Sequence, residues 1–159
     1  MSIPNYPQLA LPPCQLQVRE GRGGFSVYDL CRMLWVAFTP EEWVRQHVLH
    51  YLLYQKSYPR LLIHVEERVM VNGQPQRADI VVYGRDTKPF LLIECKAAHI
   101  AIGEDTIWQV ATYNSVLKAA YFAVTNGMGI GVFQTTDTGV SYWGTDFPEY
   151  PKREMEVIE

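Results

Sequence analysis

The chain has 159 residues, of which 48% are hydrophobic and 19% are charged, which fits one globular domain and excludes a disordered protein. Its net charge of −3 excludes a surface that is basic throughout, so binding to nucleic acid requires either basic side chains that converge locally or a partner that supplies them. No apolar run approaches the roughly 18 residues of a membrane span. We therefore expect a cytoplasmic protein that makes no membrane contact.

The N-terminal part of the chain predicts an arm followed by a β-hairpin. Four prolines fall within residues 1–14, and apolar and polar residues then alternate around Val18 up to the glycine-rich turn at residues 21–24. The expected organisation is a single domain, residues 1–159, with the arm and hairpin at 1–26, a core at 27–147 and a loosely held, charged tail at 148–159.

The first helix is predicted to begin at Thr39, which suits the N-cap, with Pro40 at the first helical position and two acids in the first turn. Apolar residues at helical spacing continue toward Tyr58, so we expect an amphipathic helix of roughly 16 residues. The acids Glu41 and Glu42 fit a role in complementing the helix dipole.

An antiparallel meander of three strands is predicted after this helix, at residues 61–71, 77–83 and 90–96, with an Asn-Gly turn after the first. A second helix to about Lys118 and a strand at 120–125 follow, and the right-handed crossover requires this strand to run parallel to a neighbour. Residues 131–134 and 140–143 predict a last hairpin. The expected fold is α/β, with a mixed sheet of about four to five strands flanked by helices.

Three ionisable residues fall in or beside the apolar strands of this meander. Asp79 directly precedes an apolar run, and Glu94 and Lys96 follow another. An unpaired buried charge costs several kcal/mol, roughly, so a cluster of three predicts a site. Because strand side chains alternate between faces, Glu94 and Lys96 share one face, and Cys95 points away and offers its backbone carbonyl.

If the two strands are neighbours, Asp79 lies across from Glu94 and Lys96. Carboxylate and carbonyl oxygens are the ligands that Mg²⁺ prefers, and a lysine beside them can orient the attacking water or stabilise charge on a phosphate. The plainer interpretation is a structural ion pair of Lys96 with Asp79 or Glu94, which is costly unless it is fully hydrogen-bonded.

Other polar residues are less specific. Glu66 fits a solvated strand residue better than a site residue, and His64 fits a packed or exposed strand residue better than a metal ligand. Gln109 and Tyr113 are four apart and share a helical face, which by spacing alone is typical of surface residues. Asp137 and Asp146 are interpreted as turn acids and not as ligands.

These motifs together resemble a known family. Asp79 with Glu94-x-Lys96 resembles the PD-(D/E)XK nuclease signature, and the matching segments elsewhere are residues 39–46, the run from Gln109 to Asn114, and residues 125–127. In this order they resemble the N-terminal nuclease domain of type I restriction enzyme R subunits, in its small stand-alone form, over residues 27–151. The resemblance implies a restriction-endonuclease-like core and a Mg²⁺-dependent DNA endonuclease, in which Mn²⁺ can substitute.

The resemblance also implies roles for individual residues. The implied metal ligands are Asp79, Glu94 and the backbone carbonyl of Cys95, and the implied catalytic residues are Glu42, Asp79, Glu94, Lys96 and Gln109. Arg45, Gln46 and Tyr113 are implied to contact DNA or to support the metal ligands. Members of this superfamily often place an acid of the first core helix beside the metal, and we favour Glu42 over Glu41 because Arg45 and Leu49 share its face.

Two features depart from the family pattern. Ala97-Ala98 follows Lys96 where relatives often have Ala-Pro, and no Gly-x-x-x-x-Gly-Lys phosphate loop is present, so this chain has no ATP site. Coupling to an ATP-driven motor would therefore require a restriction-modification or motor subunit as a partner, besides DNA. The alternative function is a catalytically inactive nuclease-fold module that binds DNA or a restriction-complex partner.

Overall fold

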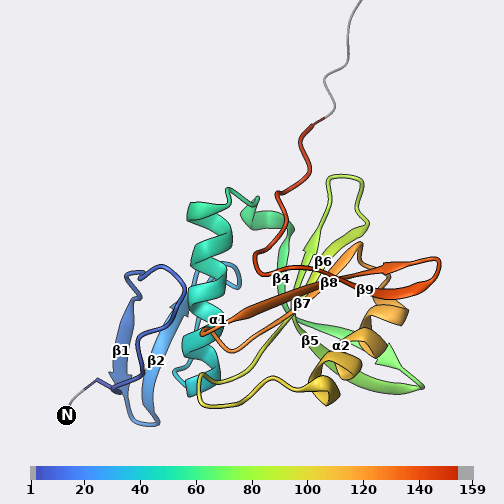
Figure 1. The fold of residues 1–159 in the computed structure, drawn as a ribbon. Helices are drawn as coiled ribbons and strands as arrows, with labels where there is room; N and C mark the ends of the chain where they lie inside the picture. The colour runs from blue at the N-terminus through green and yellow to red at the C-terminus, as the bar shows by residue number, and fades with distance from the viewer. Residues whose placement is uncertain (1–2, 154–159) are drawn as a thin grey trace, which may run out of the picture.

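The computed structural model describes residues 3–153 and is built around a six-stranded mixed sheet (Figure 1). The strands are β4 (Ile63–Val71), β5 (Gln74–Tyr83), β6 (Pro89–Cys95), β7 (Tyr121–Thr125), β8 (Ile130–Thr136) and β9 (Gly139–Gly144), in that order across the sheet. Only β6 and β7 pair in parallel, which confirms the predicted crossover. The expected number of four to five strands is too low, because the last hairpin joins the same sheet.

Two helices cover the opposite faces of this sheet, α1 (Pro40–His50) and α2 (Glu104–Leu117) (Figure 1). On the α1 side, Val48 and Leu49 pack with Ile80 and Ile93 in one buried cluster. On the α2 side, Val110 packs in a second cluster with residues that include Leu92. Neighbouring residues of β6 therefore enter different cores, as strand alternation requires.

Helix α1 begins as predicted. The Thr39 hydroxyl accepts a hydrogen bond from the Glu42 backbone N–H at 3.1 Å, and Pro40 follows at the first helical position. The α-helix gives way at Tyr51 to a π-helical turn that runs to Gln55, so the whole segment from Pro40 to Gln55 has the predicted length. Neither α1 nor α2, the helices of the described residues, has the length and apolar character needed to cross a membrane.

The N-terminal hairpin is confirmed and gains a third strand. Strands β1 (Val18–Gly21), β2 (Gly24–Asp29) and β3 (Leu34–Ala37) form a separate antiparallel sheet beside α1 (Figure 1). The turn between β4 and β5 is also as predicted, because Asn72 and Gly73 both have positive φ, of 51° and 76°, which is typical of a type I′ turn.

The C-terminal segment is held more firmly than expected for a loose tail that starts at residue 148. The Tyr58 hydroxyl donates a hydrogen bond to the Pro148 carbonyl, and the Tyr150 hydroxyl donates one to the Tyr83 carbonyl at 2.9 Å. Tyr150 also packs its ring against Phe90, with the centroids 5.7 Å apart. The packed chain thus continues at least to Tyr150, and residues 154–159 of the predicted tail lie outside the described residues.

Candidate active site

The candidate site forms where β4 and β5 change the face that they turn to each core. Val65 and Ile80 are paired and contact the α1-side core, whereas Ala78 and Val69 pack in the α2-side core. In a regular strand, side chains two residues apart lie on the same face of the sheet, so Ala78 would lie on the same face as Ile80. The register passes from Val65↔Ile80 directly to Glu67↔Ala78, so the change of face falls on Glu66, opposite Asp79.

The backbone of Glu66 accounts for this change. Its φ is +54°, in the left-handed region that costs a non-glycine residue of the order of 1 kcal/mol. One left-handed residue in a strand rotates the residues that follow it to the other face, in the way that a bulge does. The sheet is therefore interrupted at the level where the two acids lie.

Asp79 takes over the hydrogen bonding of the strand ladder at this interruption. Pairing between β5 and β6 includes Ile80↔Ile93, and beyond it the Cys95 backbone N–H donates to the Asp79 carboxylate at 2.7 Å. The Lys96 N–H, in contrast, donates to the Thr125 carbonyl at 2.9 Å, so β6 stays joined to β7. This opening between β5 and β6 brings Asp79 beside Glu94.

Asp79 and Glu94 form a buried and repulsive carboxylate pair, each 9% exposed. Burial and the neighbouring Asp79 raise the pKa of Glu94 to about 7, although Lys96 opposes the shift, with its ammonium 3.3 Å from a Glu94 oxygen. Burial also raises the pKa of Asp79, which Arg45, the Cys95 N–H, Lys96 and the neighbouring Glu94 carboxyl group partly offset. One oxygen of Glu94, Oε2, is buried and has no hydrogen-bond partner.

These features fit a divalent cation. A cation would satisfy the Glu94 oxygen that lacks a partner and would relieve the repulsion within the pair. Among residues 3–153, no group of three or more His, Cys, Asp or Glu side chains is arranged to hold a metal. The donor set at this place is thus limited to two carboxylates supplemented by backbone and solvent oxygens, a composition that suits Mg²⁺.

Arg45 of α1 lies at the edge of the carboxylate pair. Its guanidinium is 3.6 Å from Asp79 Oδ1, 3.2 Å from Glu66 Oε1 and 3.1 Å from Glu42 Oε2. Glu41, which is 3.6 Å from Arg45 and half-buried, also belongs to this edge. Burial and the charge of Asp79 raise the pKa of Glu41, and Lys96 opposes that shift.

Glu42 is placed differently from the neighbouring Glu41. Its carboxylate accepts hydrogen bonds from Arg32 at 2.7 Å and from Gln46 at 2.9 Å, besides the contact with Arg45. Gln46 is fully buried and also donates to Asp29. Glu42 and Gln46 therefore lie in a charge network behind Arg45, and Glu41 is the helix acid that borders Asp79 and Lys96.

Two further residues of this network, Asp29 and Arg32, were not expected from the sequence. Asp29 is fully buried, accepts hydrogen bonds from the backbone N–H groups of Cys31 and Arg32, and pairs with the Arg32 guanidinium at 2.9 Å. An aspartate that closes a turn and an arginine three residues later are a weak signal. Nothing in that signal points to Glu42, which comes ten residues after Arg32.

On α2, Gln109 is exposed and Tyr113 is half-buried against the α2-side core. The Gln109 amide donates to the Tyr113 hydroxyl at 3.2 Å, and this hydroxyl donates to the Gln76 side chain on β5 at 3.4 Å. Within the described residues, neither side chain has a recorded hydrogen bond to Asp79, Glu94 or Lys96. The structure therefore brings together Asp79, Glu94, Lys96 and Arg45, with Gln109 and Tyr113 outside this group.

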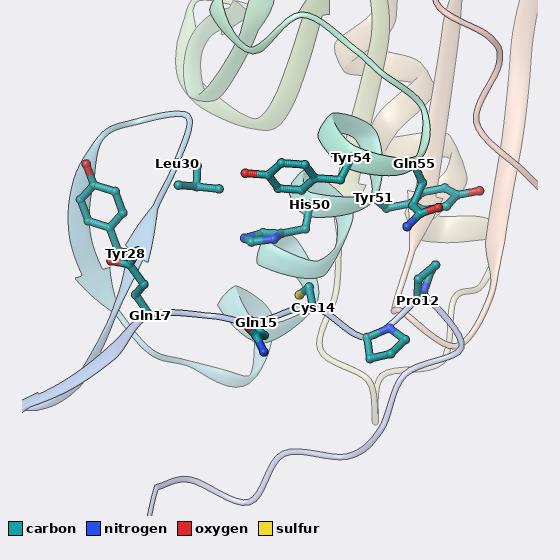
Figure 2. A pocket seen from close by; sticks show the side chains of 11 residues that line it. Pro12, Cys14, Gln15, Gln17, Tyr28, Leu30, His50, Tyr51, Tyr54 and Gln55 are labelled. Atoms are coloured by element: carbon teal, nitrogen blue, oxygen red, sulfur yellow. The ribbon is translucent and has the colours of Figure 1, made fainter.

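A cavity of about 350 Å³ lies elsewhere, between the N-terminal arm, β2 and the end of α1 (Figure 2). His50 and Tyr54 extend into it from consecutive turns, with ring centroids 5.5 Å apart. Burial raises the pKa of Cys14 to about 11 and lowers that of His50, so thiolate and imidazolium are both disfavoured at neutral pH. The lining residues of this cavity include no carboxylate, so it lacks the charged groups of the β5–β6 site.

One of two similar solved structures supports this architecture. Among solved structures, the chain is 21% identical to a fragment assigned as an HsdR subunit of a type I restriction enzyme from Vibrio vulnificus YJ016, with a TM-score of 0.50, over 71% of this chain and 24% of that one. The type IIG restriction endonuclease BpuSI is 17% identical, with a TM-score of 0.41, over 60% of this chain and 11% of its own. The first of these likenesses concerns the fold alone.

The chain thus spans about a quarter of the first solved structure and about a tenth of the second. No curated protein sequence matches it. Residues 40–147, which are more than half of the chain, match the family model described as type I restriction enzyme R protein N terminus. The chain therefore belongs to the family of type I restriction enzyme R protein N-terminal domains.

Proposed function

We propose that the chain is a divalent-metal-dependent endonuclease that hydrolyses phosphodiester bonds of DNA, with its active site at Asp79, Glu94 and Lys96. The observation that carries the proposal is the buried Asp79–Glu94 pair with one oxygen that has no partner and a lysine 3.3 Å away. Family membership supports a nuclease-related role. When bound, Mg²⁺ or Mn²⁺ would stabilise the charge that develops on the scissile phosphate.

The protein's own residues would bind the cation and position the water and the phosphate. Asp79 and Glu94, with the Cys95 carbonyl, would hold the cation. Asp79 is oriented for this role by the Cys95 N–H, which fixes one of its oxygens at 2.7 Å. The Lys96 ammonium would orient the attacking water or donate to a phosphate oxygen.

Arg45 and Glu41 complete the proposed site. A phosphate that approaches Asp79 would meet the Arg45 guanidinium, which is buried and held on its other side by Glu42 and Glu66. Gln109 and Tyr113 are proposed to contact DNA from the neighbouring surface of α2.

The proposal is tested by metal binding and by cleavage in parallel. Titration calorimetry with Mn²⁺ should give one site in the parent protein and none in Glu94→Gln, which keeps the shape of the side chain. Plasmid cleavage in Mg²⁺ should be lost in Glu94→Gln and in Lys96→Met. Asp79→Ala is the less informative variant, because it also removes the acceptor of the Cys95 N–H.

The matched control is Glu20→Gln, which removes an exposed acid of β1 and should change neither measurement. Cleavage by Glu94→Gln or Lys96→Met at the parent rate would exclude the assignment. A correctly folded parent that binds no metal, with or without DNA, and cuts no DNA would favour the inactive module.

A further inference from the structure

A basic groove lies at the end of the sheet far from the carboxylate site. It has a volume of about 810 Å³ and is formed by the β5–β6 turn, the start of β7 and the C-terminal segment, whose paths run close together in Figure 1. The charged residues that line it are Arg85, Asp86, Lys88, Lys118, Lys152 and Arg153. Five of the chain's 14 lysines and arginines thus line one groove, together with a single acid.

This concentration of positive charge is large for an acidic protein. Five cations and one anion give the groove a net charge of +4, and because the whole chain carries −3, the remainder carries −7. Among the described residues, none of the five groove cations is in an ion pair, whereas Arg32, Arg45 and Lys96 are all paired. Basic side chains therefore converge at the groove, although the protein as a whole is acidic.

Contacts between the lining residues hold the walls of the groove in place. The Arg85 guanidinium lies 4.9 Å from the centroid of the Tyr150 ring and donates to the Pro151 carbonyl at 3.3 Å. Phe90, which is half-buried, forms an apolar part of the lining. A volume of this size suits a ligand at least as large as a nucleotide, and five cations with one acid suit the phosphates of a nucleic acid backbone.

The position of the groove relates it to the proposed active site. Lys88 and Lys96 flank the two ends of β6, and eight strand residues span roughly 26 Å. This distance corresponds to about eight phosphates along one DNA strand. A DNA segment of about three-quarters of a helical turn that enters the carboxylate site is thus long enough to reach the groove.

We infer that the groove of Lys88, Lys118 and Lys152 binds the sugar–phosphate backbone of DNA at a second place, about 26 Å from the carboxylate site. This inference rests on the proposed function for its choice of ligand. The groove contacts phosphates and not bases, so it strengthens binding to any sequence equally.

The test is DNA binding in the absence of metal, which does not depend on cleavage. Anisotropy of an end-labelled 20-base-pair duplex is measured in EDTA between 50 and 200 mM salt for the parent and for the variant Lys88→Gln/Lys118→Gln/Lys152→Gln. The matched control, Arg22→Gln/Arg60→Gln/Arg68→Gln, removes three exposed cations outside the groove. We expect the groove variant to bind about tenfold or more weakly at low salt and its salt dependence to lose about two to three phosphate contacts, with the control much closer to the parent.

Two outcomes would overturn the inference. Equal weakening in the groove variant and the control would show a non-specific charge effect, and DNA binding that is absent or unchanged would exclude the groove as a DNA site. If the groove variant keeps its DNA affinity but loses binding to a poly-glutamate peptide, the ligand is an acidic protein segment instead. Cleavage is measured separately, so a parent that binds DNA through the groove but does not cut it contradicts the proposed hydrolysis and leaves the groove in place.

Discussion

Arg45 places its guanidinium 3.6 Å from the Asp79 carboxylate, at the position from which a positive charge competes with a metal for the same acid. The arginine is buried, and its other acidic contacts are with Glu41, Glu42 and Glu66. We therefore expect Arg45 to stabilise the folded protein and at the same time to weaken its affinity for a cation.

The first prediction separates these two effects. Arg45→Gln should bind Mn²⁺ about three- to tenfold more tightly, because a positive charge is removed beside the ligand, and should lower the free energy of unfolding by about 3 to 5 kcal/mol, because buried acids lose their partner. Calorimetry and urea denaturation measure the two quantities. Arg45→Lys, which keeps the charge, should leave the affinity close to that of the parent, and weaker Mn²⁺ binding by folded Arg45→Gln would contradict the competition.

The second prediction distinguishes the two acids in the first turn of α1. Glu42→Gln should lower the free energy of unfolding by about 2 to 4 kcal/mol, because Arg32 and Arg45 both lose a charged partner in the interior. Glu41→Gln should change it by less than about 1 kcal/mol, because that side chain is only half-buried and solvent screens its contact with Arg45. Mn²⁺ affinity should fall in Glu41→Gln, since a negative charge near Asp79 and Lys96 is removed. Equal stability of the two variants would contradict the placement of Glu42 in the buried charge network and of Glu41 outside it.

The third prediction concerns pH. The pKa of Glu94 is about 7 in the folded protein and near 4.3 in an unfolded chain, so the folded state retains a proton that the unfolded state loses. Stability from this residue is therefore complete below about pH 4.3 and is lost as the pH rises through 7. The parent should lose about 1 to 3 kcal/mol relative to Glu94→Gln between pH 4.5 and 8, as measured by urea denaturation.

A divalent cation should oppose this loss. Bound metal favours the ionised carboxyl group, so 10 mM Mg²⁺ should stabilise the parent at pH 8 more than at pH 5 and should not affect Glu94→Gln. Chelation with EDTA should restore the original pH dependence. A parent and a Glu94→Gln variant with parallel pH profiles would show that this carboxyl group does not titrate in the expected range.

The fourth prediction concerns the backbone of Glu66. At a regular strand position alanine is more stabilising than glycine by about 0.5 to 1 kcal/mol. At φ +54° the order should reverse, with Glu66→Gly more stable than Glu66→Ala by about 1 kcal/mol. Both variants lack the carboxylate, so the comparison isolates the backbone. Arg68→Gly and Arg68→Ala, on the same strand, should show the ordinary order.

The features that the sequence predicted correctly have local causes. The N-cap at Thr39, the Asn72-Gly73 turn and the apolar run of β6 each determine their structure within a few residues. The crossover to β7 followed from a general rule of handedness. The resemblance to R-subunit nuclease domains added the family, which the match over residues 40–147 confirms.

The features that escaped prediction depend on distant contacts. The residues from His64 to Arg68 show no signal for a left-handed residue, because Glu66 adopts this conformation where Asp79, Arg45 and Arg77 surround it. The placement of Glu42 depends in the same way on Arg32, which comes from a turn of the other sheet. Helical periodicity gives the direction of a side chain but not the partner that it meets there.

The hydrogen bond from the Cys95 N–H to Asp79 affects how the motif should be interpreted in related sequences. Asp79 closes the end of a β-ladder whether or not a metal ever binds, so selection for folding alone would preserve it in a relative that had lost hydrolysis. Glu94, whose second oxygen has no partner and whose burial is unfavourable, has no comparable structural use. On the proposed function, a homologue that retains the aspartate but replaces the glutamate should fold and cut no DNA, so the glutamate is the better diagnostic residue.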